Sequence, residues 1–247
     1  MKKLLLVLQC YNGDKAAAMR LARLIADLEP GKSKHADFMF VFRWDTEPDK
    51  ETIAYVARKF DAVHTLTTQR RTTGWPMGCN DLFFEAYNRF CLRVRQKFWD
   101  YDAALFFESD CVPLARDWIA QLQAEWYARE QLILGFVYGP GDHPVPHVNG
   151  NMLISPKFQR VCREFFACPC QHGWDVYHAK AIMKSARASR LIFNDYARRS
   201  ISCEELFAEK HYGERHPLKN ATVRPVFYHG VKGDDAVNCV REKFGIP

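Results

Sequence analysis

The chain has 247 residues, of which 48% are apolar, 14% aromatic and 26% charged, and its 35 Lys and Arg residues outnumber 29 Asp and Glu residues for a net charge of +6. The apolar fraction excludes a disordered chain, and no apolar run approaches the roughly 20 residues of a membrane span. The composition therefore predicts one globular domain over residues 1–247 and no transmembrane segment. The positive charge fits an anionic partner without selecting one.

Short apolar runs alternate with helical patterns over the first half of the chain. The runs lie at residues 4–8, 38–42, 63–66 and 103–107. They predict buried strands, because they are too short and unbroken for amphipathic helices. Apolar side chains recur at helical spacing over residues 15–28, 51–60 and 80–98. Strands and helices in alternation predict an α/β fold of the Rossmann type, with helices on both faces of a mainly parallel sheet.

The pattern becomes looser after residue 113. A helix is predicted over residues 117–129, and strands are predicted at 132–137, 152–154 and 226–228, with a proline-rich loop at 139–146. An ordered first half and a looser second half predict a nucleotide-binding half over residues 1–113 and an acceptor half over residues 114–247.

Nine cysteines are scattered along the chain, an odd number without a Cys-x-x-Cys pair. This pattern favours a reducing cytosol over a disulfide scaffold. One cluster, formed by Cys168, Cys170 and His172, could supply half of a zinc site, but no second pair of ligands stands at a usual spacing.

Polar clusters follow four of the predicted strands, where ligands bind in an open parallel sheet. The clusters are residues 9–14, 43–45, 65–71 and 108–110. Four clusters in register favour a binding site over four unrelated solvated turns. The first loop holds only Gly13, so the glycine pattern of a dinucleotide-binding fold is missing, and the chain contains no P-loop.

Glu108 and Asp110 are carboxylates at alternate positions after an apolar strand, so both point to the same side. Like charges at a strand end repel, and burying either is costly unless a cation neutralises them. Mg²⁺ or Mn²⁺, held by one or two carboxylates and by phosphate oxygens, fits this pattern. The alternative is that both acids leave the sheet for water.

Two later segments can complete such a site. His229 follows the last predicted strand and can add an imidazole ligand, and Lys232 beyond it can balance phosphate charge. A histidine in that place is more often structural. Asn149, Gly150 and Asn151 form a predicted turn that enters a strand, where two amides can bind hydroxyl groups or simply make the turn.

Together these features resemble the GT-A fold glycosyltransferases over nearly the whole chain. The resemblance depends on the polar end of the first strand, residues 43–45, the turn at 73–81, the Glu-x-Asp form of the Asp-x-Asp motif at 108–110, the turn at 149–151 and a late His-Gly-x-Lys. It implies a GT-A-like fold and a metal-dependent glycosyltransferase, a hexosyl- or pentosyltransferase. Such an enzyme would move a sugar from a nucleotide-sugar, a UDP-sugar, to a hydroxyl acceptor.

The resemblance also implies a role for each group of residues. Asp110 would be the main metal ligand, His229 would complete the coordination, and Glu108 would contact the ribose, metal-bound water or the ion. The donor-binding residues would be Gln9, Tyr11, Arg43, Asp45, Gly74, Trp75, Asn80, Asp81, Glu108, Ser109 and Lys232. The acceptor would meet Asn149, Gly150, Asn151 and Trp174.

An inverting reaction needs a carboxylate that takes the acceptor proton. The first candidate is Asp175, at the start of a predicted helix, and the next are Glu204 and Glu205. Asp175 could instead balance the helix dipole. If no carboxylate acts as base, a retaining reaction is expected.

The acceptor and the oligomeric state are left open by the sequence. Basic groups lie near residues 70, 95, 187 and 198, and such groups are usually part of a solvated surface. The more specific hypothesis is that they bind a DNA acceptor, such as a hydroxymethylated base in a bacteriophage genome. The alternatives are a cell-surface glycan or lipid-linked sugar, a non-catalytic sugar-nucleotide-binding module, and an unrelated metal-dependent phosphatase or nuclease. We expect a cytoplasmic protein, in the host cell if the chain is viral.

Overall fold

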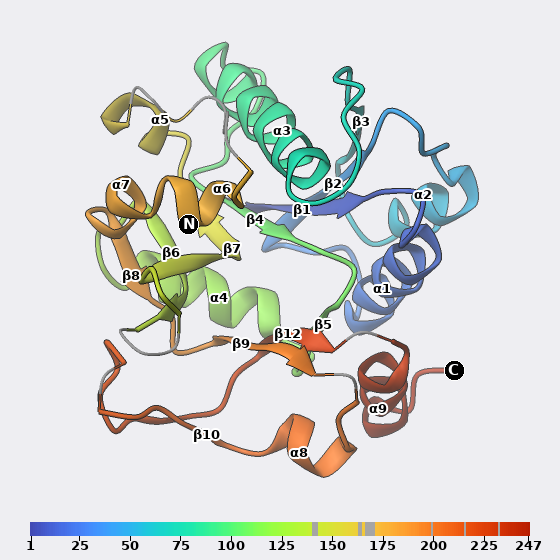
Figure 1. The fold of residues 1–247 in the computed structure, drawn as a ribbon. Helices are drawn as coiled ribbons and strands as arrows, with labels where there is room; N and C mark the ends of the chain where they lie inside the picture. Colours follow the sequence, from blue (N-terminus) through green and yellow to red (C-terminus); the bar gives the residue numbers. More distant parts are fainter. Residues whose placement is uncertain (140–142, 163–164, 166–170, 199, 215, 232) are drawn as a thin grey trace.

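A computed structural model describes residues 1–247 except 140–142, 163–164, 166–170, 199, 215 and 232 (Figure 1). A seven-stranded sheet runs through its middle. In spatial order the strands are β3 (Val63–Thr67), β2 (Ala36–Phe42), β1 (Leu4–Cys10), β4 (Ala104–Phe107), β7 (His147–Ile154), β6 (Ile133–Tyr138) and β8 (Ala186–Ala188). Strand β7 runs antiparallel to β4 and β6, whereas the other neighbouring strands are parallel. This mixed, mainly parallel sheet confirms the predicted fold class.

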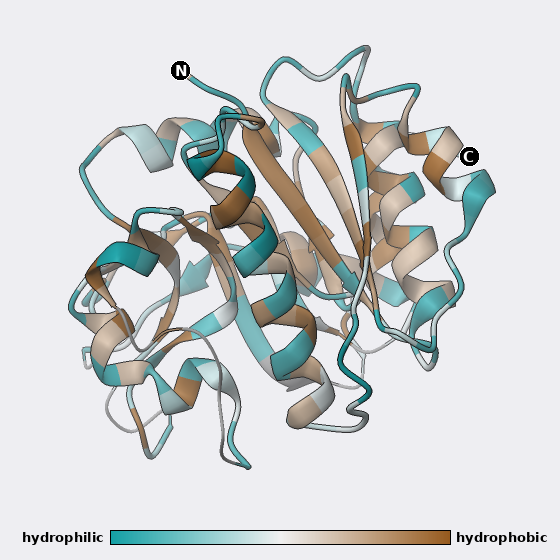
Figure 2. Ribbon diagram, turned by 90° about the horizontal axis from the view of Figure 1, so that it is seen from above, coloured by the Kyte–Doolittle hydropathy of each residue, from teal (hydrophilic) through white to brown (hydrophobic). Residues whose placement is uncertain are grey.

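Helices cover both faces of the main sheet, because its central strands are apolar on both faces. Alternate residues of β1 belong to two separate apolar clusters, as the side-chain period of a strand requires. Leu6 packs toward α1 (Lys15–Leu28) and α4 (Trp118–Tyr127), and Val7 packs toward α3 (Met77–Arg95). Figure 2 shows the hydrophobic strands between helices that carry both colours. The sheet is therefore the middle of three layers.

A second sheet of three strands begins where β4 ends. Its strands are β5 (Cys111–Pro113), β12 (Phe227–Val231) and β9 (Ile192–Arg198), in the order β5-β12-β9. Strand β12 is antiparallel to β5 and parallel to β9. The chain thus leaves the main sheet at residues 108–110, and the C-terminal strand β12 returns beside that point.

Shorter elements complete the chain. They are α2 (Lys50–Val56), α5 (Phe158–Val161), α6 (Trp174–Tyr177), α7 (Ala179–Met183), α8 (Cys203–Phe207), β10 (Lys210–His211), β11 (Thr222–Val223) and α9 (Asp235–Phe244). Strands β6, β7 and β8 belong to the predicted acceptor half and complete the same sheet as β1 to β4. The division into a nucleotide half and an acceptor half stays a prediction.

Two local predictions in the second half are wrong. The predicted turn at residues 149–151 lies inside strand β7, and His229, predicted to follow a strand, lies inside β12. Polar residues fit into β7 because their side chains find partners beside the strand: Asn151 Oδ1 accepts a hydrogen bond from the Glu108 backbone N–H at 2.9 Å. Polar residues can therefore belong to a strand that composition alone would start later.

One cysteine pair differs from the expectation of a reducing environment. Cys203 in α8 and Cys239 in α9 form a disulfide, with their Cα atoms 5.2 Å apart and 36 positions between them in sequence. Only the packing of α8 on α9 brings these thiols together. Because disulfides are rare in the cytosol, the structure gives the expected cytoplasmic location no support. Cys168 and Cys170 of the zinc alternative lie outside the described residues.

Candidate active site

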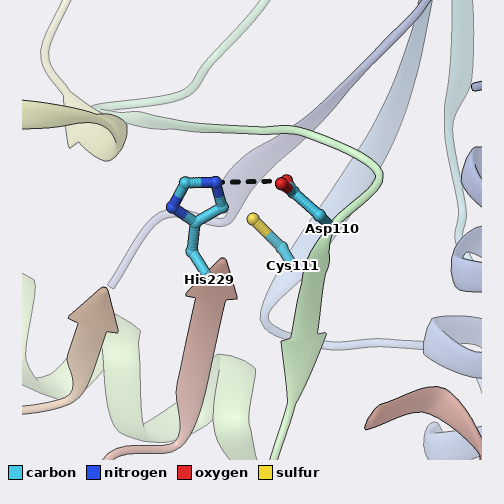
Figure 3. Close-up of side chains that lie close together, drawn as sticks. All are labelled: Asp110, Cys111 and His229. Atoms are coloured by element: carbon cyan, nitrogen blue, oxygen red, sulfur yellow. Dashed lines mark ion pairs between the residues drawn. The ribbon is translucent and has the colours of Figure 1, made fainter. Parts of the chain in front are cut away.

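Asp110 and His229 meet at the junction of the two sheets (Figure 3). The pairing of β5 with β12 places His229 opposite Cys111, and His229 Nε2 lies 3.1 Å from Asp110 Oδ1. Both side chains are only 6% exposed. Burial of a carboxylate is costly without a compensating charge. The carboxylate oxygen suits Mn²⁺ or Mg²⁺, and the imidazole nitrogen beside it can add a further ligand, so the predicted metal ligands are brought together.

Two neighbours of this pair differ in their fitness as ligands. The Cys111 thiol donates to Asn151 Oδ1 at 3.1 Å, and its sulfur lies within 4.8 Å of the other two ligand atoms. Glu108 Oε2 lies 3.8 Å from His229 Nε2, and its side chain is 45% exposed. Glu108 therefore faces the open side of the site, and Asp110 the closed side.

Asp14 is a residue of this site that sequence reasoning placed only in a polar cluster. Its Oδ2 accepts a hydrogen bond from the Ser109 hydroxyl at 2.8 Å, and its Oδ1 accepts one from the Tyr11 backbone N–H at 2.9 Å. Burial raises the pKa of Asp14, and the nearby charge of Asp110 adds to this. Asp14 thus ties the end of β1 to the acidic turn at residues 108–110, and its place in the polar cluster after the first strand was the available signal.

The predicted nucleotide-binding residues at the ends of β1 and β2 lie together. Arg43 Nε and Nη2 donate to the two carboxylate oxygens of Asp45 at 2.7 and 2.6 Å. These hydrogen bonds lower the pKa of Asp45. The Arg43 guanidinium lies 5.1 Å from the centre of the Tyr11 ring. Gln9 is buried in β1, next to Val41 of β2. This end of the sheet therefore offers an aromatic ring beside a fixed cation.

The segment at residues 73–81 divides into an exposed turn and the buried first residues of α3. Gly74 has φ +74°, a conformation that favours glycine, and Trp75 is 77% exposed. Asp81 instead accepts hydrogen bonds from Arg70 Nη1 at 2.8 Å and from the hydroxyl of Thr72. Its predicted role in donor binding receives no support from these contacts, which hold the 70–72 loop in place.

Asn80 also has partners within the chain. Its Nδ2 donates to the His172 carbonyl, and its Oδ1 accepts from the Trp174 backbone N–H, both at 2.9 Å. Asn80 therefore anchors the segment that carries Asp175, and these contacts do not turn it toward a donor. Trp174 is 6% exposed and stacks on Phe83 with ring centres 3.5 Å apart, so its ring is part of the apolar core.

Asp175 lies in α6 beside the polar residues of β7. Its Oδ2 is 3.9 Å from His147 Nε2, and a Cβ added at Gly150 would lie 3.7 Å from the same oxygen. Burial raises the pKa of Asp175, and burial lowers the pKa of His147. His147 Nδ1 donates to the Val145 carbonyl at 2.8 Å, so the lone pair or proton on Nε2 faces the carboxyl.

The predicted acceptor residues of β7 link this acid to the acidic turn at residues 108–110. Asn149 Oδ1 accepts hydrogen bonds from the backbone and the side chain of Asn151, which in turn contacts Glu108 and Cys111. Gly150 lies between the two amides, where a larger residue would crowd the Trp174 ring at 3.3 Å. The amides thus support the site from inside the sheet, and direct acceptor contacts by them stay a prediction.

Two of the remaining predicted residues, Glu204 and Glu205, lie on α8. Glu205 receives hydrogen bonds from Ser202 and forms a capping box at the start of α8. Its neighbour Glu204 is exposed on the same helix, which packs on α9. A capping box accounts for Glu205 without catalysis. Lys232 lies outside the described residues.

The main sheet, the small second sheet and an acidic turn at their junction define a GT-A-like glycosyltransferase fold. Solved structures share it. The galactosyltransferase LgtC is 13% identical with a TM-score of 0.55, and the match covers 94% of this chain and 88% of LgtC. The glycosyltransferase GlyE of Streptococcus pneumoniae TIGR4 is 10% identical with a TM-score of 0.53, over 95% of this chain and 56% of GlyE.

A third similar structure is TarS of S. aureus, 11% identical with a TM-score of 0.53, over 76% of this chain and 58% of the TarS structure. The chain thus spans less than two thirds of the length of GlyE and TarS. No protein-family model and no curated protein sequence matches the chain. Among the described residues, no helix has both the length and the hydropathy of a membrane span.

Proposed function

We propose that the protein is a metal-dependent glycosyltransferase that moves a hexosyl or pentosyl group from a nucleotide-sugar to a hydroxyl acceptor. The observation that carries the proposal is the buried Asp110–His229 pair at the sheet junction of a GT-A-like fold. Asp110 and His229 would hold Mn²⁺ or Mg²⁺, and Glu108 lies within reach on the open side. A divalent ion there supplies the positive charge that stabilises a departing diphosphate.

The donor nucleotide would bind at the ends of β1 and β2. Tyr11 and Trp44 are each 38% exposed there, and an aromatic ring can stack on a nucleobase. The Arg43–Asp45 pair fixes the guanidinium beside Tyr11, so this surface is ordered before a ligand arrives. Uridine diphosphate and UDP-sugars are the first donors to test.

Asp175 is the carboxylate that best fits the role of general base. Asp175 lies beside Gly150 of β7. The next residue of that strand, Asn151, contacts the acidic turn at residues 108–110. Its raised pKa brings proton exchange closer to neutral pH, as a general base requires. His147 faces it at 3.9 Å and can share the proton that Asp175 removes from an acceptor hydroxyl.

A saccharide hydroxyl fits the acceptor role better than a DNA base. LgtC has been solved in complex with donor and acceptor sugar analogs, whereas two of the basic residues that suggested DNA already bind partners within the chain. Arg70 binds Asp81, and Arg187 donates to the Glu125 carbonyl at 2.7 Å. A cell-surface glycan or lipid-linked sugar is therefore the first acceptor class to test, with hydroxymethylated DNA as the comparison.

The test is a thermal-shift screen of nucleoside diphosphates and nucleotide-sugars, with and without Mn²⁺. The unaltered chain should be stabilised by one nucleotide family only when Mn²⁺ is present, because binding to the native state raises the unfolding midpoint. Asp110→Asn should remove this stabilisation. Hydrolysis of simple phosphate esters without sugar transfer would instead indicate a phosphatase, and ligand binding without turnover would indicate a binding module.

A further inference from the structure

A chain of side-chain contacts leads from His229 away from the metal-binding pair. His229 Nδ1 lies 2.7 Å from Asn194 Oδ1, on the side of the ring opposite Asp110. The parallel pairing of β12 with β9 places these two residues directly beside each other. Asn194 Nδ2 donates in turn to the hydroxyl of Tyr138, at the end of β6. Asn194 is 5% exposed, so water does not compete freely for its amide.

The oxygen of an asparagine amide accepts hydrogen bonds and its nitrogen donates them. The atom that faces His229 therefore decides which nitrogen of the neutral imidazole carries the proton. The amide oxygen can only accept, so a neutral His229 that meets Asn194 Oδ1 must carry its proton on Nδ1. Its Nε2 then holds a lone pair and faces Asp110, which is the arrangement that metal coordination requires. A reversed amide would donate to Nδ1 and leave the proton on Nε2, where it would block an ion.

We propose that Asn194, hydrogen-bonded to Tyr138, is a positioning residue that holds the His229 ring in the metal-binding tautomer. This rests on the proposed function, because it assumes that Asp110 and His229 hold a divalent ion. Tyr138 accepts a hydrogen bond from the Asn194 amide N–H, so the amide nitrogen stays paired when the amide oxygen faces His229. Its ring also packs on His147 with centres 4.7 Å apart, so removal of the hydroxyl leaves that packing in place.

The readout is the affinity of the full chain for Mn²⁺, measured from the electron paramagnetic resonance signal of the free ion. Asn194→Leu keeps the approximate volume but removes the acceptor, and it should weaken Mn²⁺ binding by about 10- to 100-fold, the usual effect of losing such a partner. Asn194→Asp keeps an acceptor oxygen and should retain most of the affinity. Tyr138→Phe should weaken binding less than Asn194→Leu.

A double-mutant cycle separates positioning from general loss of structure. In the His229→Ala background, Asn194→Leu and Tyr138→Phe should cause no further loss of Mn²⁺ affinity, because both act through the imidazole. Asn238→Leu, an exposed change on α9, is the matched control and should leave the affinity unchanged. Unfolding midpoints verify that each variant is folded, and Tyr138→Phe carries the test if Asn194→Leu does not fold.

The outcomes distinguish this inference from the proposed function. If the unaltered chain binds Mn²⁺ and Asn194→Leu binds it equally well, the inference is overturned and the proposed function stands. Equal losses with and without His229 would also overturn it, because Asn194 would then act on the fold in general. If the unaltered chain binds no Mn²⁺, both are overturned.

Discussion

The Asp110–His229 and Asp175–His147 pairs are made of the same residue types but have different surroundings. In the first pair, the facing nitrogen and oxygen are 3.1 Å apart, and the second ring nitrogen meets the side chain of Asn194. In the second pair they are 3.9 Å apart, and the second ring nitrogen donates to a backbone carbonyl. The first pair joins the residue just before β5 to its partner strand β12, whereas the second joins a four-residue helix to the start of β7.

The comparison of the two pairs shows that the surroundings of an aspartate and a histidine decide which chemistry the pair suits. Strand pairing holds the ligands of an ion at a set distance, which suits Asp110 and His229. Burial acts on the other pair by favouring the neutral forms, since the pKa of Asp175 is raised and the pKa of His147 is lowered. Groups whose pKa values approach each other exchange a proton readily, which suits Asp175 and His147 for general base catalysis.

The largest effect is expected from Asp110→Asn. Loss of the buried carboxylate should lower turnover by about 1,000-fold, because a catalytic metal supplies several kcal/mol of charge stabilisation. Mn²⁺ affinity, measured in the same samples, should fall with it. Turnover close to that of the unaltered chain would show that the metal lies elsewhere and would remove the contrast between the two pairs.

Asp175→Asn should lower turnover by about 100-fold or more, since a positioned general base contributes about 10² to 10⁴. Its Mn²⁺ affinity should stay unchanged, in contrast to Asp110→Asn. A loss of less than about tenfold would exclude Asp175 as the base and favour a retaining reaction. The stereochemistry of the product, read by NMR, provides an independent check.

The pH dependence of turnover sharpens the same contrast. A base acts in its deprotonated form, and a raised pKa keeps Asp175 protonated up to a higher pH than an ordinary carboxyl. Activity should therefore fall on the acid side at a pH above the usual carboxyl value of about 3.9, with burial as the cause. An acid limb at the ordinary value, in a pH profile of kcat, would contradict this assignment.

The smallest effects are expected on α8, which belongs to neither pair. Glu205→Ala removes the capping box and should cost about 1 kcal/mol of stability, a fall of about 2–4 °C in unfolding midpoint for a protein of this size. Glu204→Ala is the matched control and should leave the midpoint unchanged. Turnover should be preserved in both variants. A large loss of turnover in either variant would identify that glutamate of α8 as the general base.

Local sequence signals predicted the first pair better than the second. The apolar run before Glu108 and Asp110 is a short-range pattern, and the structure places the turn where that run ends. Trp174 shows what such signals leave out: its stacking on Phe83 in the core was not foreseen, and its contact with an acceptor stays a prediction. Composition cannot decide which face of a four-residue helix is buried.

The sequence by itself determined the α/β class, the main strands of the first half and the acidic turn at residues 108–110, because alternation, apolar runs and strand-end polarity are properties of neighbouring residues. The tertiary structure decided which distant side chains meet. The contacts of Asp14 with Ser109 and of Asn194 with His229 join residues 95 and 35 positions apart. Strand order and pairing create such contacts, and a single sequence does not specify either.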